Sequence, residues 1–484
     1  MNIKKLKTNK GSSILEALIA IAILTLGISA ASMLAFSNQT LKLDSETESE
    51  ALYKAKTILE SARAESRDAI DFADLQSDPI PIIDGIYSKQ LIVDPFEATE
   101  CSKQIEAKVT YAPEIARPQV INLISRVVNT EEAFAMGGDC SPLPPTDPTL
   151  TKGTNGVNLG GDKTNGLDVF NRIAYITLEK KPGLAFVDGT DFNNPFQIMN
   201  GYDADSEVND VDVARDTDTG KIYAYAVRET DIDQLQIIEV TNPNSPVFIR
   251  NMNLPEVEGS SEPEGYRVYY YNNRLYVTTK ETAGPELHIF NATDPTIVLP
   301  KLGTAELNRT VNDFIVIDQN VGGTVYTLAY MVADSNLKEI AVLNVTNPGI
   351  VSEISTFNLL GGDDGYSINF SQASKLLYIG RQENGSEELY AFDASDPFTG
   401  LVEKAKNEVG INPLSIRVSG KYLYMMSDGS NKDFQIFDAN PATDLSLIWK
   451  SNNSNKGAGL DYENNYIYTL FNQGSITLQI FYAP

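Results

Sequence analysis

One short pattern repeats seven times between residue 164 and the C-terminus. Each copy is a short apolar strand that usually ends in Asp or Asn and is usually followed by proline, and a tyrosine precedes each copy by about one hairpin. A fixed period of this kind determines the architecture before any local detail does. The strand copies are Leu184–Asp188, Leu235–Glu239, Leu287–Asn291, Ala341–Asn344, Leu389–Asp393, Phe434–Asp438 and Leu478–Tyr482. The tyrosines are Tyr175, Tyr223, Tyr276, Tyr326, Tyr378, Tyr424 and Tyr468.

The repeat resembles the blade of LVIVD-type β-propellers, with variant strand endings. The resemblance implies four short strands per copy and a seven-bladed β-propeller over residues 164–484. The last copy stops at Pro484, just after its third strand. Closure therefore needs a strand from upstream, which we expect within residues 150–165. We interpret the repeated tyrosines and the Asp/Asn-Pro turns as packing and turn chemistry, not as a binding site.

The N-terminal segment places its best cleavage site before an apolar run. Four lysines precede Gly11 and Ser12. The residues from Ile14 to Phe36 are mostly apolar, and Glu16 is the one charged residue among them. An ordinary secretory signal has the reverse order. The run is long enough for a transmembrane helix of about 20 residues, and the lysines favour a cytoplasmic N-terminus. A carboxylate in such a helix is a candidate functional group.

Leader, Gly11, Glu16 and apolar run together resemble the type III signal of type IV prepilins and pseudopilins. The resemblance implies cleavage between Gly11 and Ser12 by a prepilin peptidase. It also implies that Glu16 pairs with the Ser12 amine of a neighbouring pilin during assembly. Ser12 departs from the family's usual Phe or Met, so the N-terminal methylation motif lacks its aromatic end. The implied localisation is a single-pass precursor in the cytoplasmic membrane and then an extracellular filament at the cell surface.

Helix formers continue beyond the apolar run to about Ile70, and Leu52, Ala55, Ile58, Leu59 and Ala62 recur at helical spacing. Strand patterns follow at 85–93, 105–111 and 120–128. The predicted fold class is multidomain, α+β and then all-β: a long pilin helix with a small sheet, followed by the seven-bladed propeller. The predicted domains are a leader (1–11), the transmembrane and filament-core helix (12–70), a small pilin-like head (71–136), a Pro/Gly/Thr-rich linker (137–163) and the propeller (164–484).

The two cysteines, Cys101 and Cys140, flank the second and third strands of the predicted head. An oxidising exterior would let them form a disulfide. Spacing in the sequence does not establish that their Cα atoms come close enough. Two free thiols remain the alternative.

The charge and the residue inventory exclude several functions. With 65 acidic and 38 basic residues the net charge is −27, which opposes nucleic-acid binding and suits a cationic partner or a divalent metal. The single histidine, His288, lies in a repeat strand, so histidine-based catalytic triads and zinc sites are not expected. Asp216 and Asp218 begin a weak calcium-loop pattern that lacks its glutamate at position twelve. We predict no cofactor, no metal and no enzymatic activity.

These features predict a minor type IV pilin, with the filament tip as a candidate location, that displays a propeller for adhesion or for binding a protein or polysaccharide. Its expected partners are other pilins, the prepilin peptidase, the inner membrane before assembly and an unknown surface ligand. Three alternatives stay open. They are a pseudopilin of a secretion system, a membrane-anchored surface propeller with an uncleaved leader, and a carbohydrate-active surface enzyme with carboxylates at the propeller mouth.

Overall fold

The computed structural model divides the chain into two compact units, a helix–sheet unit and a propeller. Each is described by itself. The structure describes residues 12–482 apart from a set of internal segments. These are 66–74, 95–101, 113–117, 129–149, 161–162, 217, 231, 256–263, 282, 336, 360–363, 373, 421, 430–431, 441–443, 452–455, 464 and 473–475. The side chains of residues 12–17, 20, 35–45 and 200 are likewise not described.

The N-terminal unit begins with one continuous helix, α1 (Ser12–Glu65, 54 residues). In its C-terminal part Ala51, Ala55, Leu59 and Ala62 are buried at i, i+4 and i+3 spacing, as expected for an amphipathic helix. Leu52, which we predicted on this face, is exposed, because it lies one residue, or about 100° around the helix, from Ala51. The predicted end at Ile70 lies outside the described residues.

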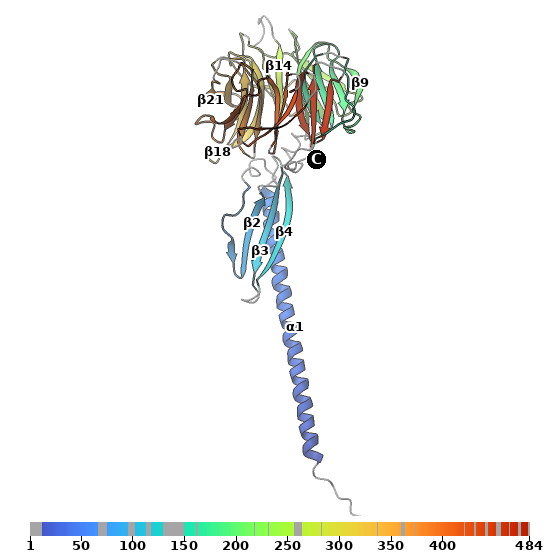
Figure 1. Cartoon of the computed structure of the whole chain (residues 1–484), viewed down its shortest axis with the longest axis vertical. Helices are drawn as coiled ribbons and strands as arrows, with labels where there is room; N and C mark the ends of the chain where they lie inside the picture. Colours follow the sequence, from blue (N-terminus) through green and yellow to red (C-terminus); the bar gives the residue numbers. More distant parts are fainter. Residues whose placement is uncertain are drawn as a thin grey trace, which may run out of the picture. The chain divides into compact units, whose positions relative to one another are not determined.

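A four-stranded antiparallel sheet accompanies the helix, in the strand order β1-β2-β3-β4 (Figure 1). Its strands are β1 (Ile82–Asp84), β2 (Tyr87–Asp94), β3 (Ser102–Tyr111) and β4 (Gln119–Val128). Ile105, Ala107 and Val109 on β3 are fully buried and alternate with partly exposed residues. The three strands predicted from the sequence are therefore confirmed, and β1 is an additional short edge strand.

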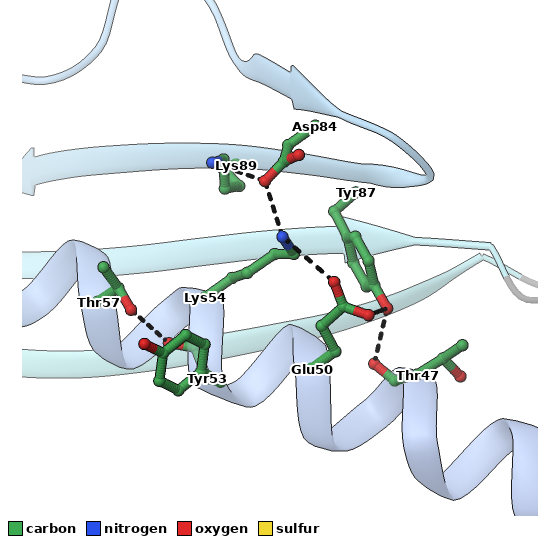
Figure 2. Close-up of polar contacts among 8 residues, drawn as sticks. All are labelled: Thr47, Glu50, Tyr53, Lys54, Thr57, Asp84, Tyr87 and Lys89. Carbon is green, nitrogen blue, oxygen red and sulfur yellow. Dashed lines mark hydrogen bonds and ion pairs between the residues drawn. The ribbon is translucent and has the colours of Figure 1, made fainter.

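Polar contacts fasten this sheet to the helix (Figure 2). Lys54 of α1 places its Nζ 2.7 Å from Asp84 Oδ2 and 3.3 Å from Glu50 Oε1. Lys89 Nζ lies 3.0 Å from the same Asp84 oxygen. The Tyr87 hydroxyl donates to Glu50 Oε2 at 3.1 Å, and its ring lies 5.0 Å from Lys54 Nζ. The ammonium of Lys54 thus links the helix to the β1–β2 hairpin.

The predicted membrane span is not supported. Among the residues that the structure describes, no helix is long and apolar enough to cross a membrane. The prediction relied on counting apolar residues from Ile14 to Phe36, a run in which Thr25, Gly27 and Ser29 are interspersed. The single-pass membrane precursor, and the passage from it to a surface filament, are corrected accordingly.

Residues 151–482 form seven four-stranded antiparallel sheets, the seven blades predicted from the repeat (Figure 1). Blades 1 to 3 contain β6 (Thr164–Phe170), β7 (Ile173–Leu178), β8 (Gly183–Asp188), β9 (Phe196–Asp203), β10 (Val208–Arg215), β11 (Ile222–Arg228), β12 (Leu235–Glu239), β13 (Val247–Met252), β14 (Gly265–Tyr271), β15 (Arg274–Thr279), β16 (Leu287–Asn291) and β17 (Lys301–Ala305). Blades 4 to 6 contain β18 (Val311–Val321), β19 (Thr324–Ala333), β20 (Ile340–Asn344), β21 (Ser352–Phe357), β22 (Gly365–Ser371), β23 (Leu376–Arg381), β24 (Leu389–Asp393), β25 (Val402–Asn407), β26 (Pro413–Ser419), β27 (Tyr422–Ser427), β28 (Phe434–Asp438) and β29 (Leu447–Lys450).

Blade 7 is completed by a strand from upstream, as predicted. It contains β30 (Gly457–Glu463), β31 (Tyr466–Phe471), β32 (Leu478–Tyr482) and β5 (Thr151–Lys152). Tyr482 pairs with Thr151, and Val157 forms a further bridge to Leu478. Part of the predicted linker is therefore the closing strand of the ring. Residues 137–149 of that linker lie outside the described part.

In six of the seven blades a buried polar residue directly precedes the third strand, and in several of them it holds the loop that leaves the blade. Glu388 Oε2 accepts the backbone N–H of Val409 at 2.8 Å, and Glu339 Oε2 accepts that of Leu359 at 3.0 Å. In blade 7 the equivalent Thr477 hydroxyl accepts the N–H of Leu159 at 3.1 Å. The same device thus operates on a segment more than 300 residues upstream. It shows that residues 151–159 belong to the repeat in space.

The strand register identifies the repeated tyrosines. In each blade a fully buried tyrosine of the second strand lies two residues before the residue that pairs with the start of the third strand. In blades 2 and 4 these are Tyr225 and Tyr330, so the predicted Tyr223 and Tyr326 are wrong. The β18–β19 hairpin of blade 4 is longer than the hairpins of the other blades. Its second strand therefore begins earlier relative to the buried tyrosine, and Tyr326 was taken for Tyr330.

The predicted fold class is corrected to mainly β. The described residues form one helix and thirty-two strands, and the strands belong to eight four-stranded sheets. The propeller dominates because the repeat occupies about two-thirds of the chain. The helix is present as described above, but an α+β pilin class is not an adequate description of the molecule.

Candidate functional site

The first strand of every blade lies at the centre of the propeller. Neighbouring blades meet through these strands, which follow one another in a closed ring from β6 to β30 and back to β6. All seven run in the same direction, since each is the first strand of an equivalent sheet. Residues at one position of the repeat therefore form a ring around the axis.

One such ring, the axial ring, lies opposite the buried tyrosines. Its members are Asp168, Asp212, Tyr269, Ile315, Asn369, Arg417 and Asp461. Two residues nearer the start of the strands lie Asp210, Arg267 and Asp313. Arg417 keeps 30% of its side-chain surface exposed and Asp461 keeps 13%, and the Arg417 Nε lies 3.1 Å from Asp461 Oδ1. These side chains lie inside the propeller and are still partly accessible to solvent. Partial exposure of this kind is expected for residues that line a narrow axial channel.

Most of these carboxylates join one blade to the next. Asp168 Oδ2 accepts the N–H of Val213 at 2.7 Å, and Asp461 Oδ2 accepts that of Val169 at 2.8 Å. Asp313 does the same for Ile368 at 3.0 Å. The axial carboxylates are therefore first of all structural, because each accepts a backbone hydrogen bond of the following blade.

The axial acids outnumber the axial bases, five to two. Burial raises the pKa of Asp210 to about 6 and that of Asp212 to about 7, and backbone N–H donors oppose the shift. Burial also raises the pKa of Asp168, and the neighbouring Asp212 and Asp461 add to it. The acidic side of the ring, contributed by blades 7, 1 and 2, thus holds protons more tightly than exposed carboxyls do.

A second ring marks one end of the axis. Every first strand contains a β-bulge near its start, opposite the end of the second strand. A bulge re-aims the side chain of the extra residue and is often found beside functional sites. We call the bulged residues the mouth ring. They are Asn165, Asn209, Tyr266, Asn312, Tyr366, Leu414 and Ala458.

The asparagines of the mouth ring are structural. Asn209 Nδ2 donates to Gly265 O at 2.8 Å, and Asn312 Nδ2 donates to Gly365 O at 2.8 Å, each in the next blade. Asn165 reaches Val208 O at 3.2 Å in the same way. Tyr266 and Tyr366 replace this asparagine in blades 3 and 5 and are half-buried. The mouth ring therefore contains two aromatic side chains at positions where blades 1, 2 and 4 have an asparagine that is hydrogen-bonded to the next blade.

Two further positions surround the mouth ring and form what we call the mouth pairs. The first member precedes the first strand and the second follows the second strand, and backbone hydrogen bonds hold several pairs together, as between Gln382 N and Asp364 O at 2.9 Å. The pairs from blade 1 to blade 7 are Lys163/Glu179, Glu207/Glu229, Glu264/Lys280, Thr310/Asp334, Asp364/Gln382, Asn412/Asp428 and Lys456/Asn472.

The mouth pairs differ in charge. Lys163 and Glu179 form an ion pair of 2.9 Å, Glu264 and Lys280 form another, and Asn412 Nδ2 donates to Asp428 Oδ2 at 2.7 Å. In blade 2 both members are glutamates, and in blades 4, 5 and 6 an acid is paired with an uncharged residue. Sequence reasoning missed this site, because only the strand register brings these positions together.

The predicted site residues lie elsewhere. Asp216 and Asp218 are in the turn between β10 and β11, where Asp216 accepts bonds from the Thr219 hydroxyl at 2.6 Å and the Asp218 N–H at 2.9 Å. Within the described chain no group of three potential ligands could hold a metal. His288 is fully buried in β16, as predicted.

The structure describes only some of the residues on which the leader and disulfide predictions rest. Ser12 and Glu16 belong to α1, and the side chain of Glu16 is not described. Gly11, Cys101 and Cys140 lie outside the described residues, so cleavage and the disulfide stay predictions.

Comparison with known proteins finds solved structures that resemble part of the chain. No protein-family model and no curated protein matches the chain. A solved protein from Lactobacillus plantarum has a TM-score of 0.50 at 11% identity and covers 74% of this chain and 95% of its own. The WD40 repeats of RRP9 score 0.49 at 9% identity, with 70% and 99% covered, and the designed protein Ika8 scores 0.43 at 10%, with 69% and 100% covered. At such identities the likeness concerns the fold alone, and the β-propeller is assigned from the seven sheets themselves.

Proposed function

We propose that this chain is a binding protein whose propeller recognises a partner at the mouth ring. The observation that carries the proposal is the exchange of a structural asparagine for Tyr266 and Tyr366 at two of seven equivalent positions. Half-buried tyrosines offer large contact area with little loss of conformational freedom, and they are enriched in binding surfaces. Leu414 and Ala458 extend the uncharged part of the ring. Nothing in the repeat itself requires any of these four residues.

The electrostatic surroundings fit recognition of a cationic or polar partner. The chain has a net charge of −27, and the mouth pairs of blades 2, 4, 5 and 6 contain acidic residues and no lysine or arginine. Such a field accelerates the approach of a positively charged partner. That the chain is not an enzyme stays a prediction.

The experiment is a binding screen of the full chain against arrays of peptides and polysaccharides, with wild type and Tyr366→Ala side by side. We expect ligands that bind wild type and lose at least tenfold in affinity with Tyr366→Ala. Tyr53→Ala is the matched control, because Tyr53 is an exposed tyrosine of α1. Equal binding by all three proteins, or no ligand at all, would overturn a binding function at the mouth.

A second function, assembly through α1 with further copies of the chain, is favoured by a separate observation. Apolar side chains of the N-terminal part of the helix are exposed, from Leu18 (61%) to Leu34 (65%). A helix with such a surface is stable in water only when another apolar surface covers it. We propose that the occupant is the same helix of a second copy, because that helix offers a matching apolar surface.

Sedimentation velocity of the full chain tests this second function. We expect self-association of the wild type and its loss when the exposed Leu24 and Leu26 are both replaced by glutamate. A wild-type chain that sediments as single molecules would contradict it.

A further inference from the structure

Blades 3 and 5 contain the same three-residue motif at the mouth. Glu264-Gly265-Tyr266 opens the first strand of blade 3, and Asp364-Gly365-Tyr366 opens that of blade 5. Both glycines begin the strand directly before the bulge. An added Cβ would lie 2.9 Å from a backbone oxygen of the preceding blade at Gly265, and 2.7 Å from a side-chain carbon of the preceding blade at Gly365. The two tyrosines therefore occupy equivalent positions that are fixed by equivalent close approaches.

In blade 3 the chain places its own cations beside the tyrosine. The Arg267 guanidinium lies 4.5 Å from the centre of the Tyr266 ring, and the Lys280 ammonium lies 5.7 Å from it. Lys280 in turn pairs with Glu264, which is nearly fully buried. The surroundings of this ring are therefore already occupied from within the chain.

Blade 5 has the ring without these cations. Ser367 stands at the position of Arg267, and Gln382 stands at that of Lys280. Tyr366 is half-buried, and among the described residues no cation, aromatic ring or hydrogen-bond partner contacts its side chain. The side-chain amide of Gln382 likewise forms no hydrogen bond with a described residue. Ring and amide are both left for a ligand.

Hydrogen bonds join this part of the mouth to blade 6. The Ser367 hydroxyl donates to Pro413 O at 2.8 Å. Tyr366 and Asn412 directly precede these two residues, so they lie at neighbouring points of the mouth. The packing is tight here, since a Cβ on Gly380 would lie 2.4 Å from Ser367 Oγ and 2.7 Å from Pro413 Cβ. The placement of Tyr366 beside the start of blade 6 is therefore fixed by contacts.

The side chain of Asn412 links two further groups. Its Oδ1 accepts the N–H of Glu383, the residue after Gln382, at 2.7 Å, and its Nδ2 donates to Asp428 Oδ2 at 2.7 Å. The Asn412 N–H reaches Asp428 Oδ1 at 3.3 Å. A carboxylate can accept about four hydrogen bonds, and Asp428 receives these two from the described residues. The network thus holds a carboxylate with spare acceptor capacity next to the end of the strand that leads to Gln382.

These groups together match the chemistry of a sugar. The hydroxyls of a sugar both donate and accept hydrogen bonds, as the amide and the carboxylate require. The C–H face of a sugar is apolar and can lie flat on a tyrosine ring. A peptide backbone offers one donor and one acceptor per residue along an extended chain, whereas this site gathers polar groups around a single ring. The mouth pairs of blades 5 and 6 contain no lysine or arginine, which disfavours an acidic sugar.

We propose that Tyr366, Gln382 and Asp428 bind one sugar unit of a neutral polysaccharide. The inference rests on the proposed binding function and specifies the chemistry of the ligand. The Tyr366 ring stacks on the C–H face of the sugar. The Gln382 amide and the Asp428 carboxylate form hydrogen bonds with its hydroxyls.

Calorimetric titration of the full chain with cellohexaose, maltohexaose, mannohexaose and chitohexaose tests the inference. We expect at least one of these neutral hexasaccharides to bind the wild type. Gln382→Lys should lose about tenfold or more in affinity, because it places an ammonium beside the ring as Lys280 does in blade 3. Val298→Lys is the matched control, since it adds the same charge at an exposed residue of the β16–β17 loop, away from the mouth ring and the mouth pairs. We expect it to retain affinity within about twofold.

The contrary outcomes are distinct. Failure of all four hexasaccharides to bind the wild type, or equal binding by Gln382→Lys and wild type, would overturn the sugar site. If the array screen nevertheless yields peptides whose binding depends on Tyr366, the proposed function stands and only the chemistry assigned to the ligand is wrong.

Discussion

Blades 3 and 5 are built alike and differ where a partner can reach them. Both open with an acidic residue, glycine and tyrosine, and both pair their strands in the same register. Blade 3 places Arg267 and Lys280 beside its tyrosine, and blade 5 has Ser367 and Gln382 there. The difference shows that a repeat protein uses different positions of its repeat for holding the blades together and for binding. Positions that hold blades together recur, and a position that departs from the repeat without a structural reason points to function.

The largest effect is expected where the two blades differ in backbone approach. Gly303 in β17 and Ala405 in β25 occupy the same register. A Cβ on Gly303 would lie 1.7 Å from Pro348 O, so Gly303→Ala should lower the free energy of unfolding of the propeller by about 3 kcal/mol. Ala405→Gly removes one buried methyl group and should cost about 1 kcal/mol. Thermal unfolding followed by circular dichroism measures both. Equal effects would show that blade 3 relaxes more easily than its packing implies.

The next effect concerns the lysine beside the tyrosine of blade 3. Lys280→Gln removes the base that faces Glu264, a side chain with 8% of its surface exposed. A nearly buried carboxylate without its cation should lower the free energy of unfolding by about 2 kcal/mol. Gln382→Lys in blade 5 should leave the stability unchanged or raise it slightly. Urea unfolding of the two single variants distinguishes them. A neutral Lys280→Gln would mean that the pair in blade 3 is not a structural contact.

A smaller effect separates blades 3 and 5 from the acidic side of the axial ring. They contribute Tyr269 and Asn369 to that ring, whereas blade 2 contributes Asp212, whose pKa is raised to about 7. The folded state therefore binds a proton that the unfolded state releases near pH 4. Stability should fall as pH rises from about 4 to about 7. Asp212→Asn should flatten this fall and stabilise the propeller at pH 8 on the order of 1 kcal/mol. Melting temperatures at pH 5 and pH 8 test it, and an unchanged pH profile in the variant would contradict it.

The smallest effect distinguishes the ring of Tyr366 from its hydroxyl. A sugar stacks on the face of the ring, so Tyr366→Phe should change the affinity for the neutral hexasaccharide by no more than about twofold. Tyr366→Ala should lose it. Calorimetry under the same conditions measures both. A large loss in Tyr366→Phe would indicate that the hydroxyl, not the ring, contacts the ligand.

The sequence predicted the scaffold well because its determinants are local. Seven copies of one strand pattern became seven sheets, and the missing fourth strand of blade 7 was found upstream at β5. The tyrosine series was misassigned in blades 2 and 4, since Tyr223 and Tyr225 alternate on one strand and only pairing with β12 distinguishes them.

The candidate site could not be predicted, because it depends on bulges and register. Tyr366, Gln382 and Asp428 lie far apart in a sequence with many acidic residues, and no local pattern joins them. The apolar run of the N-terminal segment shows the opposite limit. Its composition predicted a helix, which is present, but also a membrane span, which the structure does not support.

The most direct test of the account gives Tyr366 the cation that Tyr266 already has. Gln382→Lys places an ammonium beside Tyr366, and adding Lys280→Gln restores the net charge of the wild type while Arg267 still lies beside Tyr266. Calorimetry with the neutral hexasaccharide compares the two variants with the wild type. The account predicts that the single and the double variant both lose about tenfold or more in affinity. A single variant as strong as the wild type, or a double variant that regains the wild-type affinity, would contradict it.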